Sequence, residues 1–586
     1  MSLITPSREQ RYDRQLRLWG DRGQEILGDT SVCLLGAGAV GSELLKNLVL
    51  PGIGSFTIVD DALVTRKDLG SNFFVTSSDL GKPRAQAVAE LLSELNTDVR
   101  GNFIVESLDN LLENDPDFFL GFGAIVYTDI RENQLLRISR IVSPAHIPIV
   151  VCISVGFIGF LRVSVPEHAI IESHPDAIKP DLRLDNPPEA FVRLVNEPEN
   201  DIEALPASEL VQVPWLIIIY KFILRFRQEK GHFPASYADK QEVRKLITSA
   251  ADSMLEKCRS RGETIEPLFE LTNFQEAARA VNTAISETKI PPEVTQIFDD
   301  CRCVWSNTCV LRSPSKCPPA KHRKSEKTQS PLMNLSMATF WKLASAVKEY
   351  TLNEGHGCLP IRGDLPDMSS SSSRYLKLLS AYRESAEVAV EQLSSRLSHL
   401  SGLRLEDVRL LARNAAYLRV IKFRSLEEEL KLSPARSDDL HLIPTHECND
   451  AILWYFMLRG AASFFAEHGR WPGSLCGTSS PATASGAGAD GGDSQLFSQI
   501  VELDLPNLRN HVNRVLTASG VAVNRVCDDF VHEMCRFGGS EVHSIAAFMG
   551  GIAAQEVIKL VTHQFVPVCQ PLIYNGITQQ TDLLEF

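Results

Sequence analysis

Short apolar runs alternate with amphipathic segments of helical length near the start of the chain. Ser31–Leu35 and Ser55–Val59 have the length and composition of buried strands, and Ala39–Leu50 between them has helical length. Pro51-Gly52 ends that helix, and further strands are predicted at residues 102–105, 124–127, 147–152 and 160–165. Strands alternating with helices predict an α/β fold with a doubly wound, mostly parallel sheet.

An amphipathic helix precedes the first strand. Tyr12, Leu16 and Trp19 recur on one of its faces at helical spacing. Beside that face lie three arginines that repeat every three residues, namely Arg11, Arg14 and Arg17. From the pattern alone, this arginine ridge is a solvated helix surface.

The same patterns divide the chain into domains. We predict one domain over residues 1–166, a mainly helical insertion over 167–478, a disordered linker over 479–495 and a return to the first domain over 496–586. Segments 304–336 and 473–493 have low complexity. Ile545–Val561 is apolar nearly all round and contains small residues, so we expect a buried helix that also offers surface to a partner subunit.

Composition narrows the class of protein. The net charge of −14 argues against broad nucleic-acid binding, which depends on Lys and Arg at phosphates. The apolar run Ile147–Leu161 is shorter than the ~20 residues of a membrane-spanning helix, and the first residues lack the apolar core of a secretory signal. The 13 cysteines are scattered rather than arranged as a disulfide framework. A soluble intracellular protein without membrane contact is expected.

A glycine-rich turn is the first candidate for chemistry. Gly36-x-Gly38-x-x-Gly41 joins a predicted strand to a helix, and Asp60 ends the next strand. Such glycines let backbone amides approach a phosphate at the positive end of a helix, and the acid can bind a ribose hydroxyl. Lys82, at the start of a later helix, also suits an anion. Alternatively, the glycines serve only the turn and the contact between helix and sheet.

The cysteines do not predict a metal site. Four of them fall close together, at Cys301, Cys303, Cys309 and Cys317. Their spacing differs from the paired C-x-x-C of structural zinc sites, so free thiols are the preferred interpretation.

Several runs resemble one enzyme family. Arg11–Gly20, the glycine turn and Gly550–Lys559 are similar to the adenylation fold of ubiquitin-like-modifier-activating enzymes. Three further stretches resemble the regulatory, non-catalytic subunits that act in neddylation, namely Asn47–Ile58, Glu172–Asp176 and Leu359–Met368. The resemblance implies a Rossmann-like adenylation fold, a catalytic subunit as heterodimer partner, a ubiquitin-like modifier and a location in cytoplasm and nucleus. It also implies that the helical insertion resembles a catalytic-cysteine domain without the cysteine.

Departures from the active members imply that this chain is not catalytic alone. Ser71 stands where active members carry an arginine that holds ATP, and Ala62 replaces a second acid. None of the 13 cysteines has the Pro-x-Cys-Thr context of the family's thioester. We therefore expect no cofactor on this chain, with ATP and Mg²⁺ in the partner. By motif position, Arg14 is the arginine that the family extends to ATP in the other subunit, where a guanidinium suits phosphate oxygens.

The contact with the partner is assigned to aromatic and flexible surface segments. The candidate interface residues are Phe73, Phe74, Met368, Tyr375 and Tyr382.

Three alternatives remain at this stage. A dinucleotide-dependent oxidoreductase would explain the glycine turn and Asp60 but not the arginine helix. A self-sufficient homodimeric adenylating enzyme is opposed by Ser71. A pure scaffold would have no use for Arg14.

Overall fold

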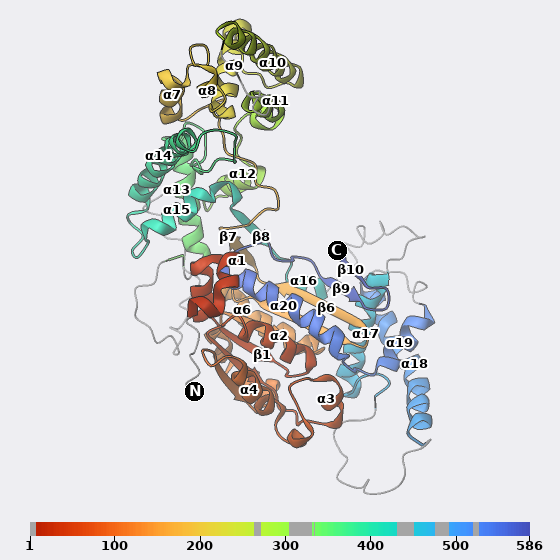
Figure 1. The fold of residues 1–586 in the computed structure, drawn as a ribbon. Helices are drawn as coiled ribbons and strands as arrows, with labels where there is room; N and C mark the ends of the chain where they lie inside the picture. The colour runs from red at the N-terminus through yellow and green to blue at the C-terminus, as the bar shows by residue number, and fades with distance from the viewer. Residues whose placement is uncertain are drawn as a thin grey trace, which may run out of the picture. The chain divides into compact units, whose positions relative to one another are not determined.

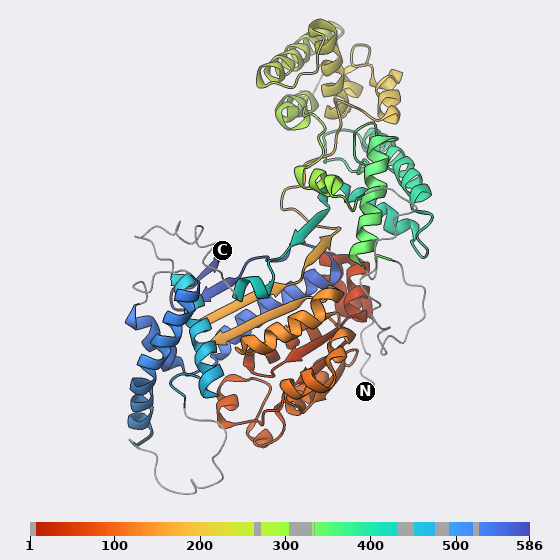
Figure 2. The ribbon, with the colours of Figure 1, turned by 180° about the vertical axis from the view of Figure 1, so that it is seen from behind.

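The computed structural model describes residues 8–262, 271–303, 331–332, 335–430, 450–474, 492–519 and 527–585. They form two compact units. Unit 1 combines the described residues of Met1–Ile170 with those of Val420–Phe586, and unit 2 comprises those of Ile171–Cys309 and Lys327–Arg419. The chain thus leaves unit 1, builds unit 2 and returns, so that red and blue segments share one unit in Figures 1 and 2.

An eight-stranded sheet lies at the centre of unit 1. In spatial order its strands are β10 (Gln580–Leu583), β9 (Leu572–Asn575), β6 (Ile158–Ser164), β5 (Ile149–Val155), β4 (Ala124–Tyr127), β1 (Ser31–Leu35), β2 (Ser55–Val59) and β3 (Arg100–Ile104). Neighbouring strands from β5 to β3 are parallel, and β6, β9 and β10 extend the sheet by antiparallel pairing. The predicted α/β fold with a mostly parallel sheet is confirmed.

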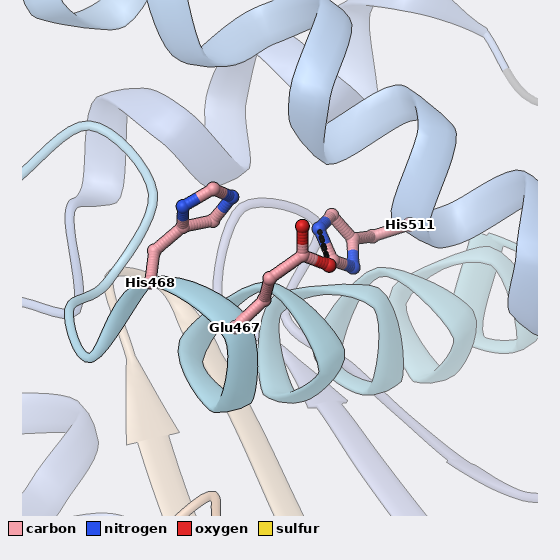
Figure 3. A group of neighbouring side chains, drawn as sticks. All are labelled: Glu467, His468 and His511. Carbon is pink, nitrogen blue, oxygen red and sulfur yellow. Dashed lines mark ion pairs between the residues drawn. The ribbon is translucent and has the colours of Figure 1, made fainter.

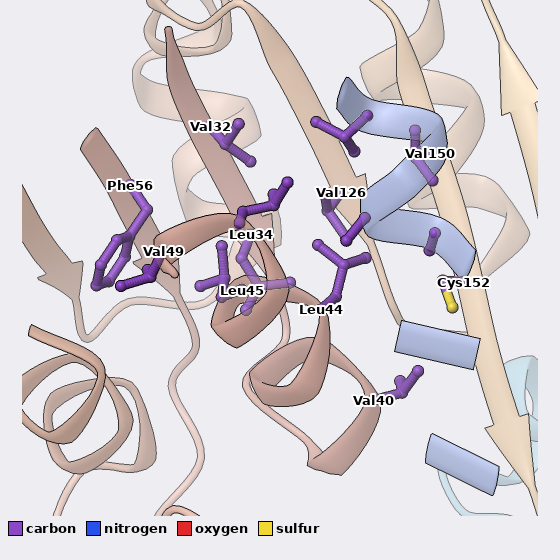
Figure 4. Close-up of a cluster of buried hydrophobic side chains, with 14 of the residues drawn as sticks. Val32, Leu34, Val40, Leu44, Leu45, Val49, Phe56, Val126, Val150 and Cys152 are labelled. Atoms are coloured by element: carbon purple, nitrogen blue, oxygen red, sulfur yellow. The ribbon is translucent and has the colours of Figure 1, made fainter. Parts of the chain in front are cut away.

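Both faces of the sheet are covered, as expected for strands with continuous apolar runs. Val32 and Leu34 of β1 point into one layer, formed with α2 (Ala39–Val49), α4 (Arg84–Leu95) and α20 (His543–Thr562) (Figure 4). Cys33 and Leu35 point into the other, formed with α5 (Leu108–Asn114), α6 (Glu132–Val142) and α17 (Asp450–His468). The α1 helix (Arg8–Asp29) adds Trp19 and Leu27 to the first layer.

Helix α20 brings the end of the chain against its beginning. A Cβ added at Gly550 would lie 2.8 Å from the backbone nitrogen of Leu44 in α2, so the two helices touch through their backbones. In the described part of the chain, α20 alone is long and apolar enough to cross a membrane, judged by length and composition only; 61% of its apolar window is buried inside the unit. The expected buried helix is present. Part of its apolar surface remains exposed, including Phe548 at 45%, and contact of this surface with a partner subunit stays a prediction.

Unit 2 is mainly helical. Its helices are α7 (Glu189–Val195), α8 (Ala207–Leu210), α9 (Trp215–Lys230), α10 (Tyr237–Ser260), α11 (Thr272–Ala284), α12 (Pro292–Asp299), α13 (Met337–Leu352), α14 (Ser372–Leu397) and α15 (Leu405–Arg413). Helix α9 starts after Pro214 and ends at Lys230, where Gly231 caps it with a positive φ of 78°. Its apolar residues form the centre of the core of this unit, together with Phe191 and Tyr382.

The return to unit 1 begins earlier than the sequence predicted. Residues from Val420 onward belong to unit 1, so the insertion ends near 419 instead of 478. The predicted boundary failed because α17 is a helix of unit 1, with Trp454 and Phe456 buried in the second layer of the sheet. Helix α16 (Leu426–Leu430) belongs to the same return, and β8 (Arg419–Lys422) pairs with β7 (Glu167–Ile170). Helices α18 (Gly492–Ala518) and α19 (Asp528–Phe537) follow, with α18 beginning inside the predicted linker 479–495. The remainder of that linker, and most of the segments 304–336 and 473–493, lie outside the described residues.

Candidate functional site

The three glycines of the turn between β1 and α2 have separate structural roles. Gly36 has a positive φ of 98°, and a Cβ there would lie 2.6 Å from Thr128 Oγ1. A Cβ at Gly41 would lie 2.5 Å from the Gly36 carbonyl oxygen, so this glycine permits close packing of helix and turn. Gly38 has an ordinary φ of −65°, but its Cβ would lie 2.6 Å from Glu541 Oε2. Glycine is therefore needed at position 38 to leave room for the Glu541 carboxylate.

Glu541 occupies the amino end of α2. Its Oε2 accepts a hydrogen bond from the Ala39 amide at 2.7 Å, and its Oε1 accepts one from the Val40 amide at 3.0 Å. Burial raises the pKa of the Glu541 carboxyl, and the two amide hydrogen bonds oppose that rise. The Gly156 amide donates to the Ser540 carbonyl at 2.7 Å, which holds this segment beside the end of β5.

Asp60 lies at the end of β2 as predicted, but its oxygens are engaged within the chain. Oδ2 accepts hydrogen bonds from the Ala37 amide and from Arg84 Nε, both at 2.8 Å, and Oδ1 accepts one from the Ala62 amide at 2.9 Å. Arg84 also reaches Asp68 Oδ1 at 3.0 Å. Burial alone would lower the pKa of Arg84, but the charges of Asp60 and Asp68 raise it overall. Asp60 is therefore paired with Arg84. The sequence had predicted a ribose hydroxyl as one possible partner of this acid.

Lys82, the third predicted anion contact, is paired with an acid. Its Nζ lies 2.8 Å from Asp79 Oδ1, and this hydrogen bond, with those of Thr76, lowers the pKa of Asp79 to about 2. Ser71 is half-buried near the end of α3 (Arg66–Ser71), where its hydroxyl donates to the Lys67 carbonyl at 3.3 Å.

These contacts test whether the turn fits a nucleotide. A bound phosphate would need the α2 amides that Glu541 already holds, and a ribose would need the oxygens of Asp60 that Arg84 and two amides already hold. The residues present do not fit a nucleotide in this arrangement.

Arg14 has a different environment from its two neighbours on the ridge. Arg11 contacts Asn96 at 2.6 Å and Asp98 at 3.1 Å, and Arg17 pairs with Asp13 at 3.0 Å. The Arg14 side chain is exposed, and within the described part of the chain it forms neither a hydrogen bond nor an ion pair. Among the described residues, its guanidinium is therefore the unpaired one of the three.

The predicted interface residues separate into exposed and buried groups. Phe73 is 81% exposed, whereas Phe74 is buried in the first layer of the sheet. Tyr382 is fully buried in unit 2, and its hydroxyl donates to the Leu182 carbonyl at 2.7 Å. Phe74 and Tyr382 are core residues, which corrects their assignment to the surface. Met368 and Tyr375 are half-buried, and their contact with a partner remains a prediction.

Sequence reasoning missed Glu541 and Arg84. Arg84 directly follows Lys82-Pro83 at the start of α4, so proximity to a predicted anion contact was an available signal. No local pattern marks Glu541, because it approaches the turn from the far end of the chain.

It also missed a cluster at the end of α17. Glu467, His468 and His511 place possible metal-ligand atoms within 4.8 Å of one another (Figure 3). Arg514 Nη2 lies 3.4 Å from Glu467 Oε2 and 3.2 Å from His511 Nε2. A divalent cation would have to displace this guanidinium, so the cluster is a charge-compensated contact between α17 and the residues of 492–518.

Comparisons with known proteins place the chain in a family. The sequence matches the ThiF family over residues 12–585. It is 39% identical to the NEDD8-activating enzyme E1 regulatory subunit of Gallus gallus, over 98% of this chain and 97% of that protein. It is 33% identical to the NEDD8-activating enzyme E1 regulatory subunit AXR1 of Arabidopsis thaliana, over 98% and 96%.

The chain belongs to the ThiF family, whose members share the adenylation fold described above. Within that family it belongs with the NEDD8-activating enzyme E1 regulatory subunits, since the similarity extends over nearly the whole of each chain. The resemblance inferred from the sequence motifs is confirmed.

Proposed function

We propose that this chain is the non-catalytic half of a heterodimer that activates a ubiquitin-like modifier, NEDD8 by the names of its relatives. The observation that carries the proposal is a contrast within unit 1. The nucleotide turn is filled by Glu541, while Arg14 is exposed and has no partner in the described chain. A chain of this kind does not bind the reacting nucleotide itself. It contributes to adenylation at the nucleotide site of the other subunit.

Arg14 is the residue proposed to reach the partner's nucleotide. A guanidinium remains charged at all relevant pH values and offers paired donors to phosphate oxygens. Negative charge that develops on phosphate during adenylyl transfer is stabilised by a donor already in place. In this arrangement the catalytic subunit binds ATP, Mg²⁺ and the modifier, and this chain supplies Arg14 and the dimer surface.

The alternatives make demands that this turn does not meet. A dinucleotide-dependent oxidoreductase and a homodimeric adenylating enzyme both need the α2 amides and Asp60 for a nucleotide of their own. Glu541 and Arg84 hold those groups here. Titration of the isolated chain with ATP and with a reduced nicotinamide cofactor tests this point, and saturable binding of either would contradict the proposal.

We also propose that the protein is located in the cytoplasm and the nucleus. Fractionation of cells tests this location.

Arg14→Ala tests the proposed role of the arginine. The heterodimer should assemble normally, because Arg14 is an exposed side chain without contacts in the described chain. The rate of ATP–pyrophosphate exchange should fall on the order of 10²-fold, as for loss of a preorganised donor. Arg14→Lys should recover only part of the rate, since an ammonium cannot form the same paired contact.

Arg17→Ala is the matched control, because Arg17 is exposed on the same helix and its pairing with Asp13 is also exposed. Arg11 is less suitable, since its contacts with Asn96 and Asp98 hold α1 in place. Equal exchange rates for the Arg14 and Arg17 variants would indicate that Arg14 does not contribute to adenylation and that this chain is a scaffold.

A further inference from the structure

We propose that Glu541 is a built-in substitute for a nucleotide phosphate and is the residue that closes this half of the heterodimer to nucleotide. Its carboxylate accepts the Ala39 and Val40 amides, which are the donors that the glycine turn presents at the start of α2. This inference deepens the proposed function, because it names the group that prevents a second nucleotide site.

Two hydrogen bonds hold the carboxylate in this position, and a third holds the adjacent main chain. The two amide hydrogen bonds measure 2.7 and 3.0 Å, and they lie at the positive end of an α-helix, where a negative charge is stabilised. The main chain next to Glu541 is held by the hydrogen bond from Gly156 to Ser540. A free phosphate would have to compete with a group that the chain keeps permanently beside the amides.

Gly38 supplies an independent sign that the position is adapted to a carboxylate. Its φ of −65° and ψ of −176° are accessible to alanine, so the backbone itself does not demand glycine. The demand comes from Glu541 Oε2, which would lie 2.6 Å from a Cβ. The glycine that would let a phosphate approach in a nucleotide site here admits an internal carboxylate.

The first test replaces the carboxylate and offers inorganic phosphate in its place. Glu541→Ala in the full chain should lower the melting temperature by about 2–4 °C, because two amides lose their acceptor. Inorganic phosphate at high millimolar concentration should then raise the melting temperature of this variant by about 2 °C more than that of the wild type, relative to chloride at equal ionic strength.

Glu502→Ala is the control, because it removes one carboxylate from an exposed position on α18 and changes the net charge equally. It should respond to phosphate as the wild type does. An equal response of all three proteins would overturn the proposal.

The second test does not depend on a free anion. Gly38→Ala should lower the melting temperature in the wild-type background, where the methyl group displaces the carboxylate. In the Glu541→Ala background the same substitution should have little effect, because the methyl group then has room. Equal losses in the two backgrounds would show that Gly38 and Glu541 act separately, and the proposal would fail.

Glu541→Gln covers the case in which Glu541→Ala does not fold. It keeps the size of the side chain but presents an NH₂ group toward one of the two amides, so it should melt below the wild type and show no selective response to phosphate. A melting temperature equal to that of the wild type would contradict the proposal. All these measurements concern this chain alone, whereas the Arg14 variants report on exchange by the heterodimer, so either hypothesis can fail without the other.

Discussion

Arg84 lies between two carboxylates beside the glycine turn. Its Nε bonds to Asp60 and its Nη1 to Asp68, and its side chain is 22% exposed. A buried charge that loses its partner is strongly unfavourable, since the protein interior solvates it poorly. Arg84 therefore holds α3, α4 and the end of β2 together through charge.

Arg84→Gln should lower the free energy of unfolding by about 3 kcal/mol, because Asp60 and Asp68 both lose their counter-charge. Arg66→Gln is the control, since Arg66 is an exposed residue of α3, and it should change stability by less than about 0.5 kcal/mol. Urea unfolding of the three proteins measures both values. Similar losses for the two variants would show that the ion pairs contribute little.

These residues also show which parts of the site can be predicted from the sequence. Gly36, Gly38 and Asp60 were placed correctly because strand, turn and helix follow one another locally. Glu541 could not be found in this way, since its position depends on the completed sheet. Tyr382 was assigned to the surface from its residue type, but Leu378 and Ala381 share its face at helical spacing, which is a core pattern.

Among the helices, α20 ends in an unusual buried contact. His563 caps it with a left-handed backbone (φ 57°), and its Nδ1 lies 2.8 Å from the Ala169 carbonyl oxygen. Its ring stacks on His168 with centroids 4.8 Å apart. Burial lowers the pKa of His563 to about 4, and burial likewise lowers that of His168. Both imidazoles are neutral in the folded protein near neutral pH.

This contact should make unit 1 acid-sensitive. In the unfolded chain His563 binds a proton near pH 6.5, and in the folded protein only near pH 4, so stability falls as the pH drops through that interval. His563→Asn keeps a residue that tolerates the left-handed backbone and should flatten the decline by on the order of 2 kcal/mol. Unfolding free energies at pH 7, 6, 5 and 4 provide the comparison.

His146→Asn is the matched control, because His146 also has a left-handed backbone (φ 54°) but is exposed. It should retain the pH dependence of the wild type. If both variants follow the wild-type curve, the histidine stack is not a source of acid sensitivity.

For the chain as a whole, Phe73 is the most exposed of its large apolar side chains in the described residues, at 81%. It stands edge-on to Phe74, with ring centroids 5.5 Å apart, and Phe74 is anchored in the core. An exposed aromatic ring on a fixed support is typical of an interface hot spot. This arrangement keeps Phe73 as an interface candidate while removing Phe74 from the contact surface.

Phe73→Ser should weaken binding of the catalytic subunit at least about tenfold, because the ring loses its apolar contact area in the complex. The fold of the chain should not change, since little of the ring is buried beforehand. Tyr237→Ser is the control, as Tyr237 is a 72% exposed aromatic residue of unit 2. Calorimetric titration gives both affinities, and equal affinities would place Phe73 outside the interface.

The division of unit 1 between the two ends of the chain has a consequence for biosynthesis. When Ile170 has been made, α2 has neither α20 against it nor a carboxylate on its amides, and both arrive only with residues 541–562. At about 5–20 residues per second, translation of the intervening segment takes on the order of 20–70 s. During that interval we expect the apolar layer that α20 later covers to remain exposed. The need for chaperones should therefore be greatest during synthesis of unit 2, before α20 packs against α2.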